Sequence, residues 1–257
     1  MDVKWYGTAT IGIKENGNEI LFDPFLRRNP FLKNTTGIDG FTGRKAIFVT
    51  HGHFDHIWDI PAILNMDKDV TVYCTQVAAD NLIKQGADSS RLHIIEHGDK
   101  IETDGLTVTA YKAKHIVFDA GYIAQVFARC VFLCPVLFKL VAWNHQCPLK
   151  DEILIYEIDN GEKRVMLSGS FGWFEDIEYP ENADMFVLAH GGSTRVPKLV
   201  SPFIAKTKPK KILMDHWDDA FPPLTRRVNA EKSCRILKSE YNDIEFIMPQ
   251  EQKIYTV

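Results

Sequence analysis

Three histidines and one aspartate lie within six residues, in the segment from His51 to His56. The preceding residues, 47–50, are mostly apolar and predict a buried strand. Side chains alternate along a strand, so His51 and His53 face the same way, and the turn that follows brings Asp55 and His56 to an adjacent position. Zinc and similar cations take such nitrogen and oxygen ligands at about 2.0–2.2 Å. The sequence therefore predicts a metal site at the end of this strand.

The His-x-His-x-Asp-His pattern of residues 51–56 resembles the signature of metallo-β-lactamase-fold hydrolases, and the resemblance extends along nearly the whole chain. Residues 3–25 resemble the opening hairpin of that superfamily. Asp23-Pro24-Phe25 and the segment 216–221 are similar to the branch that contains ascorbate-6-phosphate lactonase and phospholipase-D-like relatives. The resemblance implies an α/β fold, a four-layer αββα sandwich with metals at one edge.

A metal held by two histidines alone would be under-coordinated, so further ligands have to come from elsewhere in the chain. His115 follows a predicted strand and matches the superfamily position that completes the first metal site. His216 follows another predicted strand and matches the last ligand, which belongs to a second site. The resemblance thus implies six metal ligands: His51, His53, Asp55, His56, His115 and His216.

Ser170 departs from the family pattern, because relatives usually place an aspartate after the glycine at position 169. That carboxylate bridges the two metals, whereas a serine hydroxyl is neutral and a poor ligand. Two dications about 4 Å apart repel by about 4 kcal/mol even in water, and an anionic bridge offsets this repulsion. We therefore expect one firmly bound metal, zinc with manganese or iron as alternatives, and a second that is weakly bound or absent.

Two further residues are expected beside the ligands. Asp23 is expected to accept the second ring N–H of a ligand histidine, or else to serve only as a turn residue before Pro24. His190, which begins a His-Gly-Gly-Ser-Thr segment, either contacts substrate or metal or has a structural role in its loop. The remaining histidines are expected to be structural or to face solvent: His93, His97 and His145.

The expected chemistry is hydrolysis of an ester, lactone or phosphodiester bond. A metal with an open position lowers the pKa of bound water from 15.7 to about 7. Asp55 would hold the attacking group, while His216 steadies the second position. The alternative, raised by Ser170, is a metal-binding protein with weakened or lost catalysis that serves as a ligand or lipid sensor. A diiron redox enzyme is disfavoured, because neither carboxylate-rich coordination nor a flavin-carrying partner domain is evident.

The most apolar stretch, residues 116–141, directly follows His115. A membrane span needs about 20 apolar residues in a row, and Arg129 near its centre would cost about 2.5–3.5 kcal/mol. Two short helices, 118–128 and 131–143, fit better, as a helical cap insertion over residues 116–147. This insertion is either extra core or a homo-oligomer contact through 116–143. The third alternative is a lid that admits an apolar substrate, and such a lid would also dock on a membrane surface.

Hydrophobic patterns place the rest of the chain in alternating elements. They predict strands at 3–14, 19–22, 70–74, 106–113, 152–158, 163–167, 185–189, 212–214, 245–248 and 253–257, and helices at 61–66, 76–85, 197–205 and 231–241. The 257 residues contain no linker-like stretch, which predicts a single domain over 1–257. The net charge of -4 argues against a nucleic-acid partner. The expected partner of the hydrolase is a small-molecule substrate. Without a signal-peptide pattern or disulfide-scaffold spacing, a reduced, cytoplasmic protein is expected.

Overall fold

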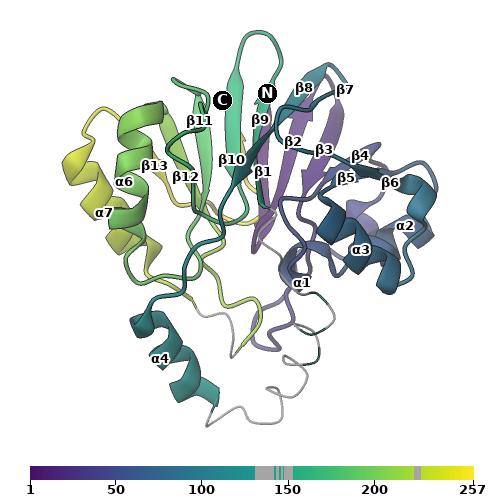
Figure 1. Cartoon of the computed structure of the whole chain (residues 1–257), viewed down its shortest axis with the longest axis horizontal. Coiled ribbons are helices and arrows are strands. Elements are labelled where there is room, and N and C mark those ends of the chain that lie inside the picture. The colour runs from purple at the N-terminus through teal and green to yellow at the C-terminus, as the bar shows by residue number, and fades with distance from the viewer. Residues whose placement is uncertain (131–141, 143–144, 146, 148–152, 223–226) are drawn as a thin grey trace.

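Two seven-stranded sheets pack face to face in this computed structural model, which describes residues 1–130, 142, 145, 147, 153–222 and 227–257. Helices cover the outer face of each sheet (Figure 1). The strand order is β14-β1-β2-β3-β4-β5-β6 in the first sheet and β13-β12-β11-β10-β9-β8-β7 in the second. The αββα sandwich predicted from the sequence is confirmed.

The first sheet contains the N-terminal strands and the last strand of the chain. Its strands are β1 (Asp2–Gly7), β2 (Thr10–Glu15), β3 (Asn18–Phe22), β4 (Ala46–Phe48), β5 (Thr71–Cys74), β6 (Leu92–Ile94) and β14 (Ile254–Thr256). The helices associated with it are η1 (Ile38–Phe41), α1 (Phe54–Ile57), α2 (Ile60–Met66), α3 (Gln76–Lys84) and η2 (Ser89–Arg91). Apolar side chains of α2 and α3 pack with residues of β4 and β5 in one cluster.

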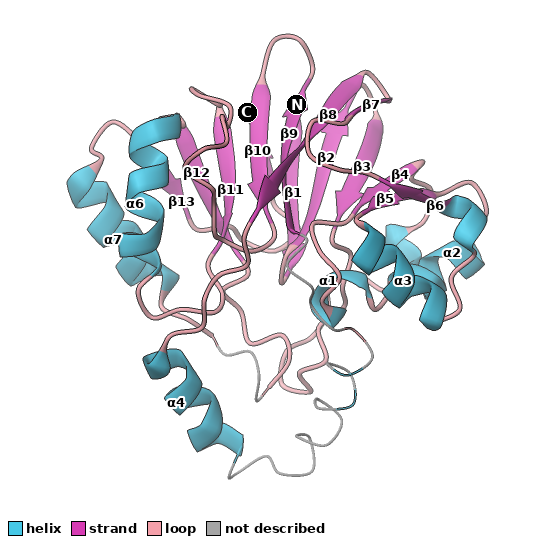
Figure 2. Cartoon of the chain, viewed as in Figure 1, coloured by secondary structure: helices cyan, strands magenta, loops and turns pink. Residues whose placement is uncertain are grey.

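The second sheet follows in the chain. Its strands are β7 (Lys100–Thr103), β8 (Leu106–Ala113), β9 (Ile153–Asp159), β10 (Arg164–Ser168), β11 (Met185–Ala189), β12 (Lys211–Asp215) and β13 (Glu245–Ile247). Its helices are α6 (Val196–Thr207) and α7 (Ala230–Glu240). A further helix, α4 (Ala120–Cys130), lies apart from both helical layers (Figure 2).

The central core lies between the two sheets, where alternate residues of each strand point inward. Phe22 and Phe48 of the first sheet meet Tyr156 of the second, with ring centroids 5.5 and 5.7 Å from the tyrosine ring. All three side chains are fully buried. This apolar layer fixes the position of the two sheets, and therefore of the strand ends that carry the polar residues.

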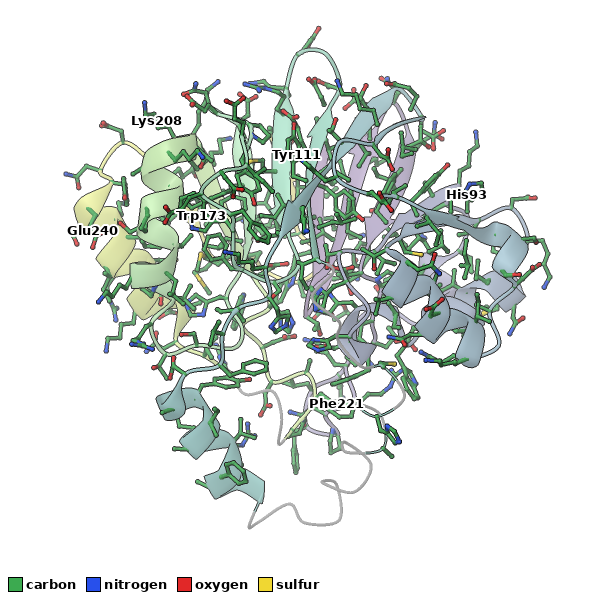
Figure 3. All side chains as sticks on the ribbon, viewed as in Figure 1. His93, Tyr111, Trp173, Lys208, Phe221 and Glu240 are labelled. Carbon is green, nitrogen blue, oxygen red and sulfur yellow. The ribbon has the colours of Figure 1, made fainter. Side chains whose placement is uncertain are left out.

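Most predicted elements are present within a residue or two of their expected bounds. The helix expected at 118–128 is α4, whereas the one expected at 131–143 falls largely outside the described residues. Strands β6 and β7 were not predicted. In the part of the chain that the structure describes, no helix is both long and apolar enough to cross a bilayer. His93 lies at the outer edge of the first sheet (Figure 3), and His93, His97 and His145 are exposed, as expected.

Candidate metal centre

Among the strands that end at one edge of the sandwich, six are followed within three residues by a polar residue that could take part in a site. Strands β3 and β4 run parallel, as do β10, β11 and β12. The carboxyl ends of parallel strands meet at the same edge of a sheet. The residues that follow β3, β4, β8, β10, β11 and β12 are Asp23, the segment from His51, His115, Ser170, His190 and His216.

Three histidines form the first group of side chains that could hold a metal: His51, His53 and His115. One ring nitrogen from each lies within 4.8 Å of the others. Nε2 of His51 is 3.3 Å from Nδ1 of His53, and the His53 and His115 ring centroids are 4.8 Å apart. Nitrogens converging in this way fit the donor set of zinc or a similar cation.

The second group consists of Asp55, His56 and His216, whose donor atoms also lie within 4.8 Å of one another. Asp55 Oδ2 lies 3.4 Å from Nε2 of His216, and Asp55 Oδ1 lies 3.8 Å from Nε2 of His56. The His51 and His56 ring centroids are only 4.0 Å apart, so the two groups adjoin. We call these six residues the strand-end cluster.

Oxygen atoms behind the cluster orient its histidine rings. Nδ1 of His51 is 3.0 Å from the Thr50 hydroxyl, which donates to Asp23 Oδ2 at 2.6 Å. Nδ1 of His115 is 2.8 Å from the carbonyl oxygen of Ile116. These acceptors place the ring proton on Nδ1 and leave Nε2 facing the cluster, the arrangement usual behind metal-binding histidines.

Asp23 contacts a second ring as well. Its Oδ2 lies 2.8 Å from Nδ1 of His56, which is within ion-pair distance. The angle at this contact lies outside the range of a hydrogen bond. The Thr50 backbone N–H donates to Asp23 Oδ1 at 2.8 Å, and Asp23 is fully buried. A Cβ at Gly169 would overlap the Thr50 hydroxyl, so this close approach between β4 and β10 requires glycine.

The two groups differ in charge. Burial lowers the pKa of His51 well below its usual value and that of His53 to about 4, and neighbouring histidines add to the effect on His51. Burial would raise the pKa of Asp55, but His56 and His216 hold it well below its usual range. Burial would likewise lower the pKa of His216, which the Asp55 carboxylate raises to about 9. Burial also lowers the pKa of His115, so the first group is uncharged, while the second holds two opposite charges, the Asp55 carboxylate and a protonated His216.

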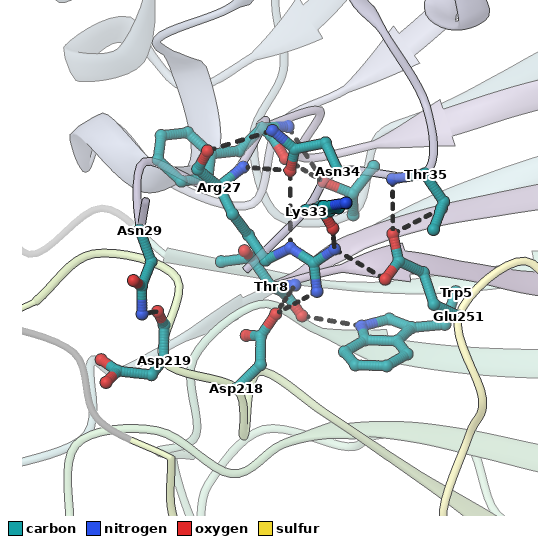
Figure 4. Close-up of polar contacts among 12 residues, drawn as sticks. Trp5, Thr8, Arg27, Asn29, Lys33, Asn34, Thr35, Asp218, Asp219 and Glu251 are labelled. Atoms are coloured by element: carbon teal, nitrogen blue, oxygen red, sulfur yellow. Dashed lines mark hydrogen bonds and ion pairs between the residues drawn. The ribbon is translucent and has the colours of Figure 1, made fainter. Parts of the chain in front are cut away.

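Figure 4 shows a network of polar contacts around Arg27, Thr8 and Asp218, which holds the backbone of the nearby His216. The His216 N–H donates to the carbonyl of Thr8 at 2.8 Å, and the Thr8 N–H donates to Asp218 Oδ2 at 3.1 Å. Arg27 lies 3.5 Å from the same carboxylate oxygen and 2.6 Å from Glu251. Thr8 and His216 have φ values of 51° and 52°, strained for residues other than glycine, so this network maintains an unfavourable backbone.

Ser170 and His190 occupy different surroundings. The Ser170 hydroxyl accepts a hydrogen bond from the N–H of Ile116 at 3.1 Å and lines the cavity described below. His190 is buried, and its Nε2 lies 2.6 Å from the hydroxyl of Ser233 on α7. It is not among the described residues that line the cavity. The structure therefore places Ser170 beside the strand-end cluster and His190 against the outer helix.

A cavity of about 240 Å³ opens at the strand-end cluster. At one end it is lined by His53, Asp55, His56, His115 and His216, which are polar. At the other end it is lined by apolar residues of α4 and the turn before it.

The residues at the polar end of the cavity were identified from the sequence. The network of Arg27, Thr8 and Asp218 was not, because it had no local signal in the sequence.

Comparisons with known proteins agree with this geometry. A family model described as a beta-lactamase superfamily domain matches residues 18–124. A UPF0173 metal-dependent hydrolase of Salinibacter ruber is 27% identical over 231 residues, 90% of each chain. The chain spans about half the length of other curated relatives, including 48% of one from Chelativorans sp. that is 34% identical over 116 residues.

Two solved structures share the fold across all of this chain. Igni18, a metallo hydrolase from Ignicoccus hospitalis, superposes with a TM-score of 0.69 at 16% identity and over 98% of its own length. CmlA, a diiron beta-hydroxylase from Streptomyces venezuelae, has a TM-score of 0.64 at 10% identity and is matched over 54% of its length. At these identities the likeness concerns the fold alone.

Proposed function

We propose that this chain, which belongs to the metallo-β-lactamase superfamily, is a metal-dependent hydrolase of a small molecule. The observation that carries the proposal is the convergence of two donor groups at the polar end of one cavity. The relatives named metal-dependent hydrolase support it. The bond to be cleaved is an ester, lactone or phosphodiester.

The donor set fits zinc, with manganese and iron as alternatives. His51, His53 and His115 would hold one ion, and Asp55, His56 and His216 the other. A bound ion of this kind supplies a Lewis acid and a water with a pKa near 7. Asp55 lines the cavity as an acceptor that would orient the attacking water, and the hydrogen-bonded His216 would hold Asp55 in place.

We further propose that one ion is bound firmly and the second weakly. The Ser170 hydroxyl, at the position where the resemblance to the superfamily implies a bridging carboxylate, is neutral and already accepts the Ile116 N–H. It does not offset the repulsion between two dications, about 4 kcal/mol at 4 Å in water and more in a partly buried site.

Metal analysis and activity together test the proposal. Protein purified without chelator and then dialysed should retain about one equivalent of metal, and adding metal should increase hydrolysis of ester, lactone or phosphodiester substrates. Chelation should abolish hydrolysis. Two equivalents surviving dialysis would contradict the weak second site, and metal-independent hydrolysis would contradict the assignment of the cluster.

The neutral Ser170 favours a second candidate function, a ligand or lipid sensor with weakened or lost catalysis. A sensor would bind metal and an apolar ligand without turnover on any of the three substrate classes. The same panel separates the two functions, because metal-dependent turnover with more than one product per protein molecule excludes a sensor that lacks catalysis.

A further inference from the structure

Helix α4 presents an unusual apolar face. Phe118, just before the helix, and Ile123 and Phe127 within it have exposed fractions of 47, 42 and 68%. Tyr122 and Val126 complete the set that lines the cavity. Residues at i, i+1, i+4 and i+5 lie on one side of a helix, so these side chains form a continuous surface. We call these five residues the α4 wall.

The α4 wall is continuous with the strand-end cluster. The Phe118 ring lies 5.4 Å from the His115 ring, edge to face, and stacks on Tyr122 at 5.5 Å. Both ends of the surface line the same cavity. A molecule whose reacting bond lies at the cluster therefore extends its remaining atoms along α4.

Polar contacts at both helix ends hold the α4 wall over the cavity. Asp119 accepts hydrogen bonds from the Ser193 hydroxyl at 2.6 Å and from the Thr194 N–H at 2.6 Å. At the other end, Arg129 pairs with Asp219 at 2.6 Å, and Asp219 follows the cavity residue Asp218. The wall is thus attached to two loops beside the cluster, which favours a preformed binding surface.

The charge along the cavity is equally informative. Among the lining residues that the structure describes, none is a lysine or an arginine. The carboxylates in the lining are those of Asp55 and Asp218, and the histidines that line the cavity all belong to the cluster. An anionic group at the α4 end would lose its hydration without gaining a cationic partner there, whereas an alkyl group would bury apolar surface on both sides.

From this arrangement, we propose that the substrate is an ester or lactone whose acyl part is a long, uncharged alkyl chain, bound along the α4 wall. This inference rests on the proposed hydrolase function. Hydrolysis forms a bond between the water oxygen and the acyl carbon and breaks the bond from that carbon to the leaving oxygen. The leaving oxygen takes up one proton of the water, and the products are an alcohol and a carboxylate with release of the other proton.

The test uses nitrophenyl esters with acetyl, butyryl, hexanoyl, octanoyl and decanoyl chains on the metal-loaded protein. Each buried methylene should raise kcat/KM by up to about four-fold. The adipoyl half-ester, as long as the hexanoyl ester but ending in a carboxylate, should react at least ten-fold more slowly than it. Equal kcat/KM across the series, or equal rates for the adipoyl and hexanoyl esters, would overturn the inference.

Two variants locate the effect. Phe127→Ser should lower the ratio of kcat/KM for the decanoyl ester to kcat/KM for the acetyl ester about ten-fold. Phe31→Ser is the matched control, since Phe31 is 88% exposed and does not line the cavity. Equal losses of kcat/KM for the decanoyl ester in both variants would mean that the alkyl chain of the substrate binds away from the α4 wall.

Octanol, which carries no bond to hydrolyse, separates this inference from the hydrolase proposal. Its binding is followed through the amide resonances of α4 and should weaken in Phe127→Ser. If no ester is hydrolysed but octanol binds in this way, the hydrolase proposal fails and the apolar site stands. If esters are hydrolysed but octanol does not bind, the α4 wall is not the site.

Discussion

The strand-end cluster and the α4 wall line one cavity, yet they are held in different ways. Side chains of the cluster follow strands of two packed sheets, and buried groups such as Thr50 and Asp23 support them from behind. The α4 wall projects from the sandwich and is half exposed. Among the described residues, Asp119 and Arg129 anchor it to the neighbouring loops.

The difference matches two requirements, accurate positions for metal ligands and adaptable contacts for an apolar ligand. A metal site requires its ligands to be fixed within a few tenths of an ångström, and buried hydrogen bonds provide that accuracy. An apolar chain is recognised by the area it buries, so its binding surface tolerates small movements. We therefore expect changes in the cluster to abolish the reaction and changes in α4 to alter selectivity.

Removing a cluster ligand should have the largest effect. His115→Ala takes away one of three donors in its group. Loss of an ion removes several kcal/mol of transition-state stabilisation, so kcat/KM should fall on the order of 10³-fold. His93→Ala, which changes an exposed histidine, is the control. Metal content by mass spectrometry and ester turnover are measured together, and a fully active His115→Ala would exclude this site.

Among these changes, the largest loss in the free energy of unfolding should come from removing Arg27, whose ion pairs lie behind His216. Arg27→Met leaves the carboxylates of Asp218 and Glu251 without the guanidinium that pairs with both. Breaking a buried ion pair on one side typically costs about 3–5 kcal/mol. Urea unfolding measures the change, with Lys33→Met, an exposed cation nearby, as the control. A loss below 1 kcal/mol would mean that the network does not support the fold.

The sequence predicted the ends of the strands better than the contacts behind them. Strand β4 is apolar, and the histidines that follow it alternate with other residues, so the position of the segment from His51 could be predicted from the local sequence. Arg27 and Asp218 are 191 positions apart, and an ion pair over that separation leaves no periodic trace. Strand β7, with mostly exposed or half-exposed residues, gave no apolar signal and was missed.

The α4 wall and the strand-end cluster also differ in how much of each could be predicted from the sequence. The helix now seen as α4 followed from its composition, but the side facing the cavity depends on Asp119 and its partners on a distant loop. Likewise, Ser170 was recognised as neutral, whereas its bond to the Ile116 N–H required the fold. The ligand roles of the six cluster residues stay predictions until a metal is measured.

A smaller effect is expected from the carboxylate behind the ligands. Asp23→Asn keeps the size of the side chain and suits its positive φ of 48°, but it replaces one acceptor facing Thr50 and His56. Such changes typically lower metal affinity or activity 10–100-fold. Asp104→Asn has a similar φ of 51° away from the cluster and is the matched control. Competition with a chelator measures the affinity, and equal affinity in both variants would assign Asp23 a turn role only.

The smallest effect should come from the anchor of α4, and it should depend on pH. Hydrogen bonds from Ser193, Thr194 and the Tyr122 N–H outweigh burial and hold the pKa of Asp119 well below its usual value of about 3.9. A depressed carboxyl pKa means that the stabilisation is complete above about pH 4 and is lost as the pH falls through the folded-state value. Asp119 also caps the helix, and losing such a cap costs about 1 kcal/mol.

Hydrogen exchange at α4 amides, corrected for intrinsic rates, reports this anchor directly. Protection in the unmodified protein should be constant from pH 7 to 5 and fall below pH 4, while β4 stays protected. Asp119→Ala should show the lower α4 protection already at pH 7, with metal content unchanged and chain-length selectivity reduced. If α4 and β4 instead lost protection together at every pH, the helix would be an integral part of the sandwich, and the contrast between a fixed cluster and a separately anchored wall would not hold.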